Sequence, residues 1–189
     1  MRLSWYLVLL LGLLPRAQAQ TQLRPAVDPR IGRANFAAPT LTALASRAGY
    51  IVAGKVIRVQ RIPPQESGGI ATVRATLQVE QALKGVRAGT RFTFTQWAGA
   101  GQDYREGERV LLFLYPRSKA GLNSPVGGDW GRFQLNAGNV VLGRARARAF
   151  FGQATLSLPA SQPATPLPEV MSLADFTAQV KKAIPRPAR

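Results

Sequence analysis

The sequence predicts a mainly β protein: a small antiparallel barrel, closed or partly open, of five to six strands, with a short N-terminal helix and a C-terminal helix. Residues 110–115 form a continuous apolar run between Gly107 and Pro116, which indicates a strand buried on both faces. The other strand candidates alternate apolar and polar residues, so each has one face in water and packs its other face around this run. Closure of the sheet would remove the strand edges that otherwise promote aggregation.

Residues 1–19 have the pattern of an export signal peptide. A short basic start is followed by the apolar stretch 3–14, which is too short to span a bilayer comfortably, and by the small-residue cleavage motif Ala17-Gln18-Ala19. We therefore expect cleavage after Ala19 and a periplasmic or secreted mature protein. The chain contains no cysteine, which excludes disulfides and cysteine-ligated metals.

Residues 20–38 show no periodicity and are predicted to be a flexible lead-in to a domain over 39–156. That domain should open with a helix over 41–48, because Thr40 is a suitable N-cap and apolar residues recur at helical spacing. Its stripe consists of Leu41, Leu44 and Ala45.

A β-hairpin is predicted next. Residues 50–62 and 70–81 alternate in polarity, and the intervening segment 63–69 is rich in proline and glycine. Gly54 lies inside the first of these strands and suggests a bulge or a tight bend. The remaining strands are expected at 90–97, 109–115, 130–135 and from 140 to about 145 or beyond.

The C-terminal part of the sequence changes character. Residues 157–170 are rich in proline and predict an extended linker, and a helix is predicted over 171–184. Ser172 and Asp175 have the spacing of a capping box. The apolar positions of this helix form one stripe that should dock on the barrel.

Four segments, in this order, resemble netrin-like and tissue-inhibitor-of-metalloproteinase-like domains and their bacterial secreted relatives. They are Gly49–Val56, Glu80–Gly85, Gly107–Leu114 and Gly127–Phe133, within roughly residues 40–145. The resemblance implies an OB-like five-stranded barrel. The animal inhibitors of this class chelate the protease zinc through an N-terminal cysteine. Since this chain has no cysteine, peptidase inhibition would require a cysteine-independent contact.

The sequence offers little catalytic chemistry. It has no histidine and no cysteine, which removes the commonest general base, the commonest metal ligands and thiol nucleophiles. Asp103, Glu106 and Glu108 are close in sequence and could form a weak Ca²⁺ site, although a solvated loop is the favoured interpretation. We therefore expect no enzyme activity, no cofactor and no metal site.

The chain is strongly basic, with 25 Lys and Arg against 9 Asp and Glu. Such a balance attracts polyanions and anionic lipids, or it keeps the protein soluble and has no further role. On a strand, Arg144, Arg146 and Arg148 would share one face and end beside Phe150. This stripe is the candidate binding surface, with Trp97, Tyr104 or Phe150 as stacking residues for an anionic ligand. The alternatives are an edge strand protected by charge and a protein-binding site.

These features together predict a non-enzymatic exported binding module that acts through a barrel face or the basic stripe. A peptidase inhibitor of the related class and a binder of polyanions or anionic membranes are the alternatives. The expected partner is a protein or an anionic surface such as lipid headgroups, with no specific nucleic acid, and we expect a monomer. Trp130 and Phe133 are expected in the core or at the barrel mouth rather than at a ligand.

Overall fold

The computed structural model describes residues 38–64, 69–98, 104–155 and 167–185. All of them belong to one compact unit. The predicted signal peptide, nearly all of the lead-in, Asp103 and most of the predicted linker therefore lie outside the described residues. Within the described residues, none of the helices is long and apolar enough to cross a bilayer.

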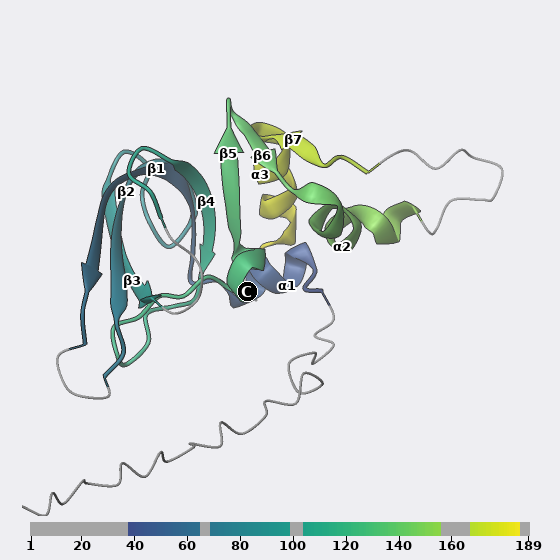
Figure 1. Cartoon of the computed structure of the whole chain (residues 1–189). Coiled ribbons are helices and arrows are strands. Elements are labelled where there is room, and N and C mark those ends of the chain that lie inside the picture. The colour runs from purple at the N-terminus through teal and green to yellow at the C-terminus, as the bar shows by residue number, and fades with distance from the viewer. Residues whose placement is uncertain (1–37, 65–68, 99–103, 156–166, 186–189) are drawn as a thin grey trace, which may run out of the picture. The chain divides into compact units, whose positions relative to one another are not determined.

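The protein is mainly β, as predicted, and its strands form one antiparallel sheet of seven strands in the order β3-β2-β1-β4-β5-β6-β7 (Figure 1). The sheet is not closed, because β3 and β7 are its two edges. The strands are β1 (Tyr50–Ile62), β2 (Thr72–Lys84), β3 (Arg91–Trp97), β4 (Arg109–Leu114), β5 (Arg132–Asn136), β6 (Asn139–Val141) and β7 (Val170–Ser172). The helices are α1 (Leu41–Arg47), α2 (Gly143–Thr155), α3 (Leu173–Ala183) and the short 3-10 helix η2 (Gly128–Gly131).

Strand β4 is buried on both faces, which confirms the prediction from its apolar run. Leu111 and Phe113 point into one hydrophobic core, which also contains Ile51 and Ala53 of β1. Val110, Leu112 and Leu114 point into a second core on the opposite face. The described residues therefore form two cores that share the central pair β1–β4.

The second core lies inside the curl formed by β1, β2, β3 and β4 (Figure 1). The predicted hairpin of β1 and β2 is confirmed, with a register irregularity between Ala53 and Gly54. A Cβ atom at Gly54 would lie 2.2 Å from the carbonyl oxygen of Gln78, so the close approach of the two strands requires glycine here.

The loop that follows β4 returns across the open side of this curl. Pro125 forms an isolated antiparallel bridge with Leu114 of β4. The backbone N–H of Asn123 donates a 2.7 Å hydrogen bond to the carbonyl oxygen of Thr95 on β3. This loop therefore contacts both ends of the four-strand array.

The first core lies between the sheet and two helices. Helix α1 contributes Leu44 and helix α3 contributes Phe176 and Val180, all fully buried. Both predicted N-caps are present: the Thr40 side chain accepts a hydrogen bond from the N–H of Ala43, and Ser172 accepts one from Asp175. The apolar stripe of α3 therefore packs into the first core, together with residues of α1 and of the sheet.

Residues 143–155 form helix α2, so the predicted continuation of strand six beyond Val141 is wrong. The alternation of arginine and alanine has the period of a strand, but both residues are also among the best helix formers. The only β-branched residue of α2 is Thr155, at its end. Strand β6 pairs with β5 on one side and with β7 on the other, and β7 lies partly in the predicted linker. Strand β5 also begins later than predicted, because η2 occupies 128–131.

Candidate anion-binding groove

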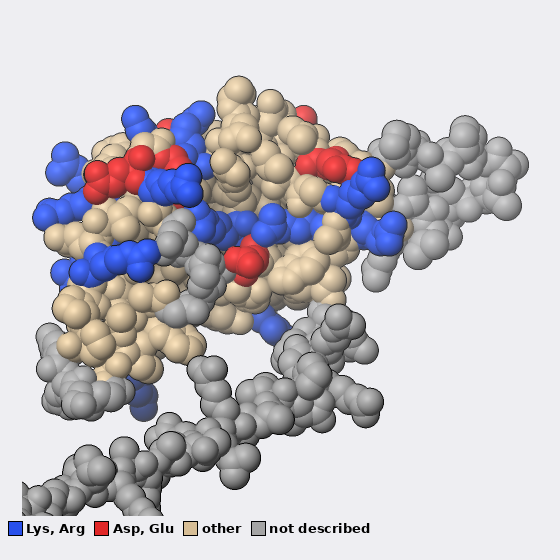
Figure 2. Space-filling view, in the orientation of Figure 1, with Lys and Arg blue, Asp and Glu red and all other residues tan. Residues whose placement is uncertain are grey.

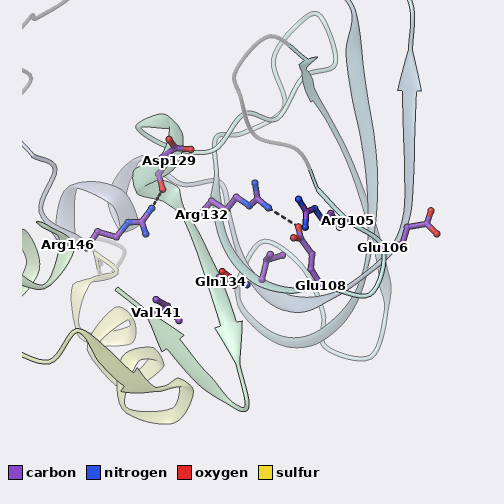
Figure 3. A pocket seen from close by; sticks show the side chains of 9 residues that line it. Arg105, Glu106, Glu108, Asp129, Arg132, Gln134, Val141 and Arg146 are labelled. Carbon is purple, nitrogen blue, oxygen red and sulfur yellow. Dashed lines mark hydrogen bonds and ion pairs between the residues drawn. The ribbon is translucent and has the colours of Figure 1, made fainter. Parts of the chain in front are cut away.

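A groove of about 750 Å³ lies where the curled strands meet β5 and α2 (Figure 3). Six charged side chains line it, and they come from separate parts of the chain. The loop before β4 supplies Arg105, Glu106 and Glu108, η2 supplies Asp129, β5 supplies Arg132 and α2 supplies Arg146. We call this surface the arginine groove. The neutral residues of its lining are Val110, Gln134 and Val141.

Arg132 is held in place at the centre of the groove. Its Nη2 atom donates to Glu108 Oε1 at 2.9 Å, and the two side chains are only 21% and 18% exposed. The guanidinium carbon also lies 4.4 Å from the centre of the Tyr104 ring. The ion pair and the cation–π contact together fix the position of this charge.

Tyr104 lies beneath Arg132 and is buried. Its hydroxyl donates to Gln96 Oε1 at 3.2 Å, and its ring packs edge-on against Phe94 at 5.3 Å. Burial raises the pKa of Tyr104 well above its usual value, while Arg132 lowers it and Glu108 raises it to smaller extents. Tyr104 was predicted as a stacking residue for a ligand. In the structure it supports the groove from below, because Arg132 covers its ring.

Arg146 reaches the groove from α2. It donates a hydrogen bond to the backbone carbonyl oxygen of Asp129, and its guanidinium carbon lies 4.9 Å from the centre of the Phe133 ring. The side chain is half-buried, and burial lowers its pKa while the nearby Asp129 raises it. An arginine retains its charge under such conditions. The contacts therefore hold a cation at the α2 side of the groove.

The neighbouring loop residues Arg105 and Glu106 differ in their contacts. Arg105 is exposed and, within the residues that the structure describes, makes no ion pair. Glu106 points away from the groove in Figure 3, and its Oε1 atom accepts a 2.9 Å hydrogen bond from the N–H of Val59. Figure 2 shows basic side chains running in a line across this face, from the curled strands toward α2. With Glu106 turned away, three arginines and two carboxylates remain around the groove.

The predicted basic stripe is wrong, because its three arginines lie on a helix rather than a strand. Successive residues of a helix are rotated by about 100°, so alternate positions do not share a face. Only Arg146 enters the arginine groove. Arg144 is exposed and pairs with Glu169 at 2.9 Å, and Arg148 is exposed.

The predicted aromatic contacts are separated as well. Phe150 is half-buried, and its ring packs against Trp130 at 6.2 Å and Phe133 at 6.0 Å, so it belongs to the protein interior. Trp97 is exposed on β3, where it pairs with Thr72, and it does not line the arginine groove.

Sequence reasoning missed Arg105 and Arg132 as site residues. The alternation of β5 did indicate that Arg132 and Phe133 face opposite sides. What the sequence does not contain is the pairing of Arg132 with Leu112, which brings this arginine to the side of the curled strands. Glu108 precedes the paired residues of β4, and its side chain reaches Arg132 from the loop.

The acidic loop residues have protein partners. Glu106 accepts from Val59 and Glu108 pairs with Arg132, so the two carboxylates are used separately. Among the described residues, no group of three or more His, Cys, Asp and Glu is placed to hold a metal ion.

No protein-family model matches this chain, and no curated protein or solved structure matches it.

Proposed function

We propose that this chain is an exported, non-enzymatic binding module that holds an anionic ligand in the arginine groove. The observation that carries the proposal is the convergence of Arg105, Arg132 and Arg146, which come from a loop, a strand and a helix. In Figure 3, Arg132 lies between the other two. Like charges brought together repel one another unless anions compensate them. Glu108 pairs with Arg132 and Asp129 lies near Arg146, so Arg105 supplies the charge that an incoming anion would meet.

The chemistry of the groove favours a ligand with carboxylate or phosphate groups. A guanidinium presents a planar fork of N–H donors that matches both groups, and such charge-assisted bonds are stronger than neutral ones. A space of about 750 Å³ is larger than a single small anion requires. The ligand should therefore carry two or more acidic groups. Arg105 would bind the acidic group that lies nearest the solvent.

We further propose that the curled half is an open, OB-like barrel of the netrin-like and inhibitor-like type. The curl of β3-β2-β1-β4 supports this, as does the return loop that hydrogen-bonds to both β4 and β3. Such a barrel permits ligand binding, but the fold alone does not imply it.

The test is a binding titration with two labelled probes, an oligoglutamate peptide and an inorganic oligophosphate, followed by fluorescence anisotropy at low and at about 0.15 M ionic strength. R105Q removes an exposed charge without breaking an ion pair in the described structure. We expect it to weaken binding of the preferred probe about tenfold, which corresponds to roughly 1.4 kcal/mol. The matched control is K181Q, which removes an exposed charge from α3 outside the groove.

Equal losses in R105Q and K181Q would show that net charge, rather than the groove, attracts the probes. Binding of neither probe by the unaltered protein would refute the proposal. A preference between the two probes would identify which acidic group the ligand carries.

A further inference from the structure

A second basic surface lies on the outward face of the β1–β2–β3 part of the sheet. Its side chains alternate with the buried residues Val73, Ala75 and Leu77, so they point away from the core. Strand pairing places them in four rows across the three strands. The rows are Lys55–Gln78–Arg91, Arg58–Thr76–Thr93, Gln60–Arg74–Thr95 and Ile62–Thr72–Trp97.

These rows contain four basic side chains and no acidic one. Lys55, Arg58, Arg74 and Arg91 are all exposed. The next outward position of β2 is Glu80, and its carboxylate is paired with Arg109 of β4. The basic side chains at the left border of Figure 2 lie where Figure 1 shows these strands. We call this surface the basic sheet face.

One end of the basic sheet face is apolar. Trp97 is 52% exposed and Ile70 is 61% exposed, and Ile62 lies in the same row as Trp97. A hollow of about 380 Å³ beside them is lined in part by Ile62, Ile70, Thr72 and Arg74. Exposed large apolar side chains grouped together commonly mark an interaction site.

We propose that the basic sheet face docks the protein on the surface of an anionic lipid bilayer. The four cations would contact the headgroups, while Trp97 and Ile70 would enter the interface between headgroups and acyl chains. Tryptophan favours this depth because its ring is apolar and its N–H is polar. An anionic partner fits this face because the four rows contain basic residues and no acidic one. The apolar end favours a membrane as the partner, because a soluble polyanion would offer Ile70 no apolar contact.

This proposal is independent of the arginine groove. None of the residues in the four rows lines that groove, so each surface can be altered without touching the other. The two proposals can therefore fail separately.

The test is co-sedimentation of the purified exported protein, its N-terminus checked by mass spectrometry, with vesicles of phosphatidylcholine alone or mixed with phosphatidylglycerol. We expect binding to the mixed vesicles only. R58Q/R74Q/R91Q should reduce the partition coefficient about a hundredfold, since each basic residue near an anionic surface contributes about fivefold. The matched control is R148Q/K181Q/K182Q, which removes three exposed charges outside this face and should change partitioning by less than about threefold.

A second variant tests the apolar end. W97S/I70S keeps all charges and should weaken binding to mixed vesicles about tenfold. Brominated lipid should quench the emission of the unaltered protein, and W97F should abolish this quenching. Both substituted sites are exposed, so circular dichroism should show an unchanged fold.

Three outcomes would overturn the proposal. The first is equal loss in the two triple variants, which would mean that net charge alone causes binding. The second is unchanged binding in R58Q/R74Q/R91Q. The third is unchanged binding in W97S/I70S together with strong competition by soluble polyphosphate, which would assign the face to a polyanion.

Discussion

The ion pair of Arg132 and Glu108 offers a sharp test of how the arginine groove is built. In R132Q, Glu108 would keep its charge in a site where its side chain is only 18% exposed and would lose the guanidinium 2.9 Å away. In E108Q, Arg132 would still lie over the Tyr104 ring. We therefore expect R132Q to be the more destabilising substitution.

The magnitude follows from the burial of the pair. Removing one partner of a fully buried ion pair costs about 3–5 kcal/mol, whereas an exposed pair contributes about 1 kcal/mol or less. This pair is partly buried, so we expect about 2 kcal/mol for R132Q and about 1 kcal/mol for E108Q. The double variant R132Q/E108Q should be more stable than the sum of the two losses predicts, because no unpaired charge remains.

Urea unfolding followed by circular dichroism measures all three variants, with equal slopes required for the comparison. A matched control is the cycle of Arg144 and Glu169, whose exposed pair also has a 2.9 Å distance. That cycle should give a coupling energy near zero, within about 0.5 kcal/mol. The reasoning is refuted if R132Q and E108Q cost the same and their effects are additive.

Three further predictions concern the cores. G54A should destabilise the fold by roughly 3 kcal/mol or shift the β1–β2 register, since a Cβ atom would lie 2.2 Å from the Gln78 carbonyl oxygen. Urea unfolding measures the loss of stability, and NMR detects a change of register. An unchanged stability and register would contradict the close approach of β1 and β2 at this position. F176A should cost about 3–5 kcal/mol, because the ring is fully buried and 5.1 Å from Phe133, and a loss below about 1 kcal/mol would mean that α3 is not docked. Because burial raises the pKa of Tyr104, the hydroxyl stays protonated in the folded protein at pH values where it ionises in the unfolded chain, so stability should fall as pH rises above about 10. Y104F should lose this part of the pH dependence in unfolding curves recorded between about pH 9 and 11, and an unchanged slope would contradict the burial of the hydroxyl.

The elements set by local sequence were predicted well. The apolar run of β4, the alternation of β2 and the caps Thr40 and Ser172 act through neighbouring residues, and each is present in the structure. Helix α2 was missed because alternating arginine and alanine satisfies the strand period and the helix propensity at once. Tertiary contacts decide such a segment, in this case the burial of Ala147.

The candidate site was predicted less well for a related reason. Of the six binding residues proposed from the sequence, only Arg146 lines the arginine groove, and it is joined there by Glu106 and Glu108 of the acidic loop. Arg132 and Glu108 are 24 residues apart in the sequence and meet only in the folded protein, so no local pattern indicates their ion pair. The exposed position of Trp97 likewise depends on its pairing with Thr72 at the end of the hairpin.

Because the central pair β1–β4 faces both cores, we expect that neither the helical side nor the curled strands can unfold independently. Unfolding the helical side would expose Leu111 and Phe113 of β4, while the other side chains of the same strand stay packed within the curl. We expect the amide protons of β4 to exchange with solvent only through global opening, at the same rate whether a destabilising change is made in α3 or in β2. Thermal unfolding should then be a single calorimetric transition.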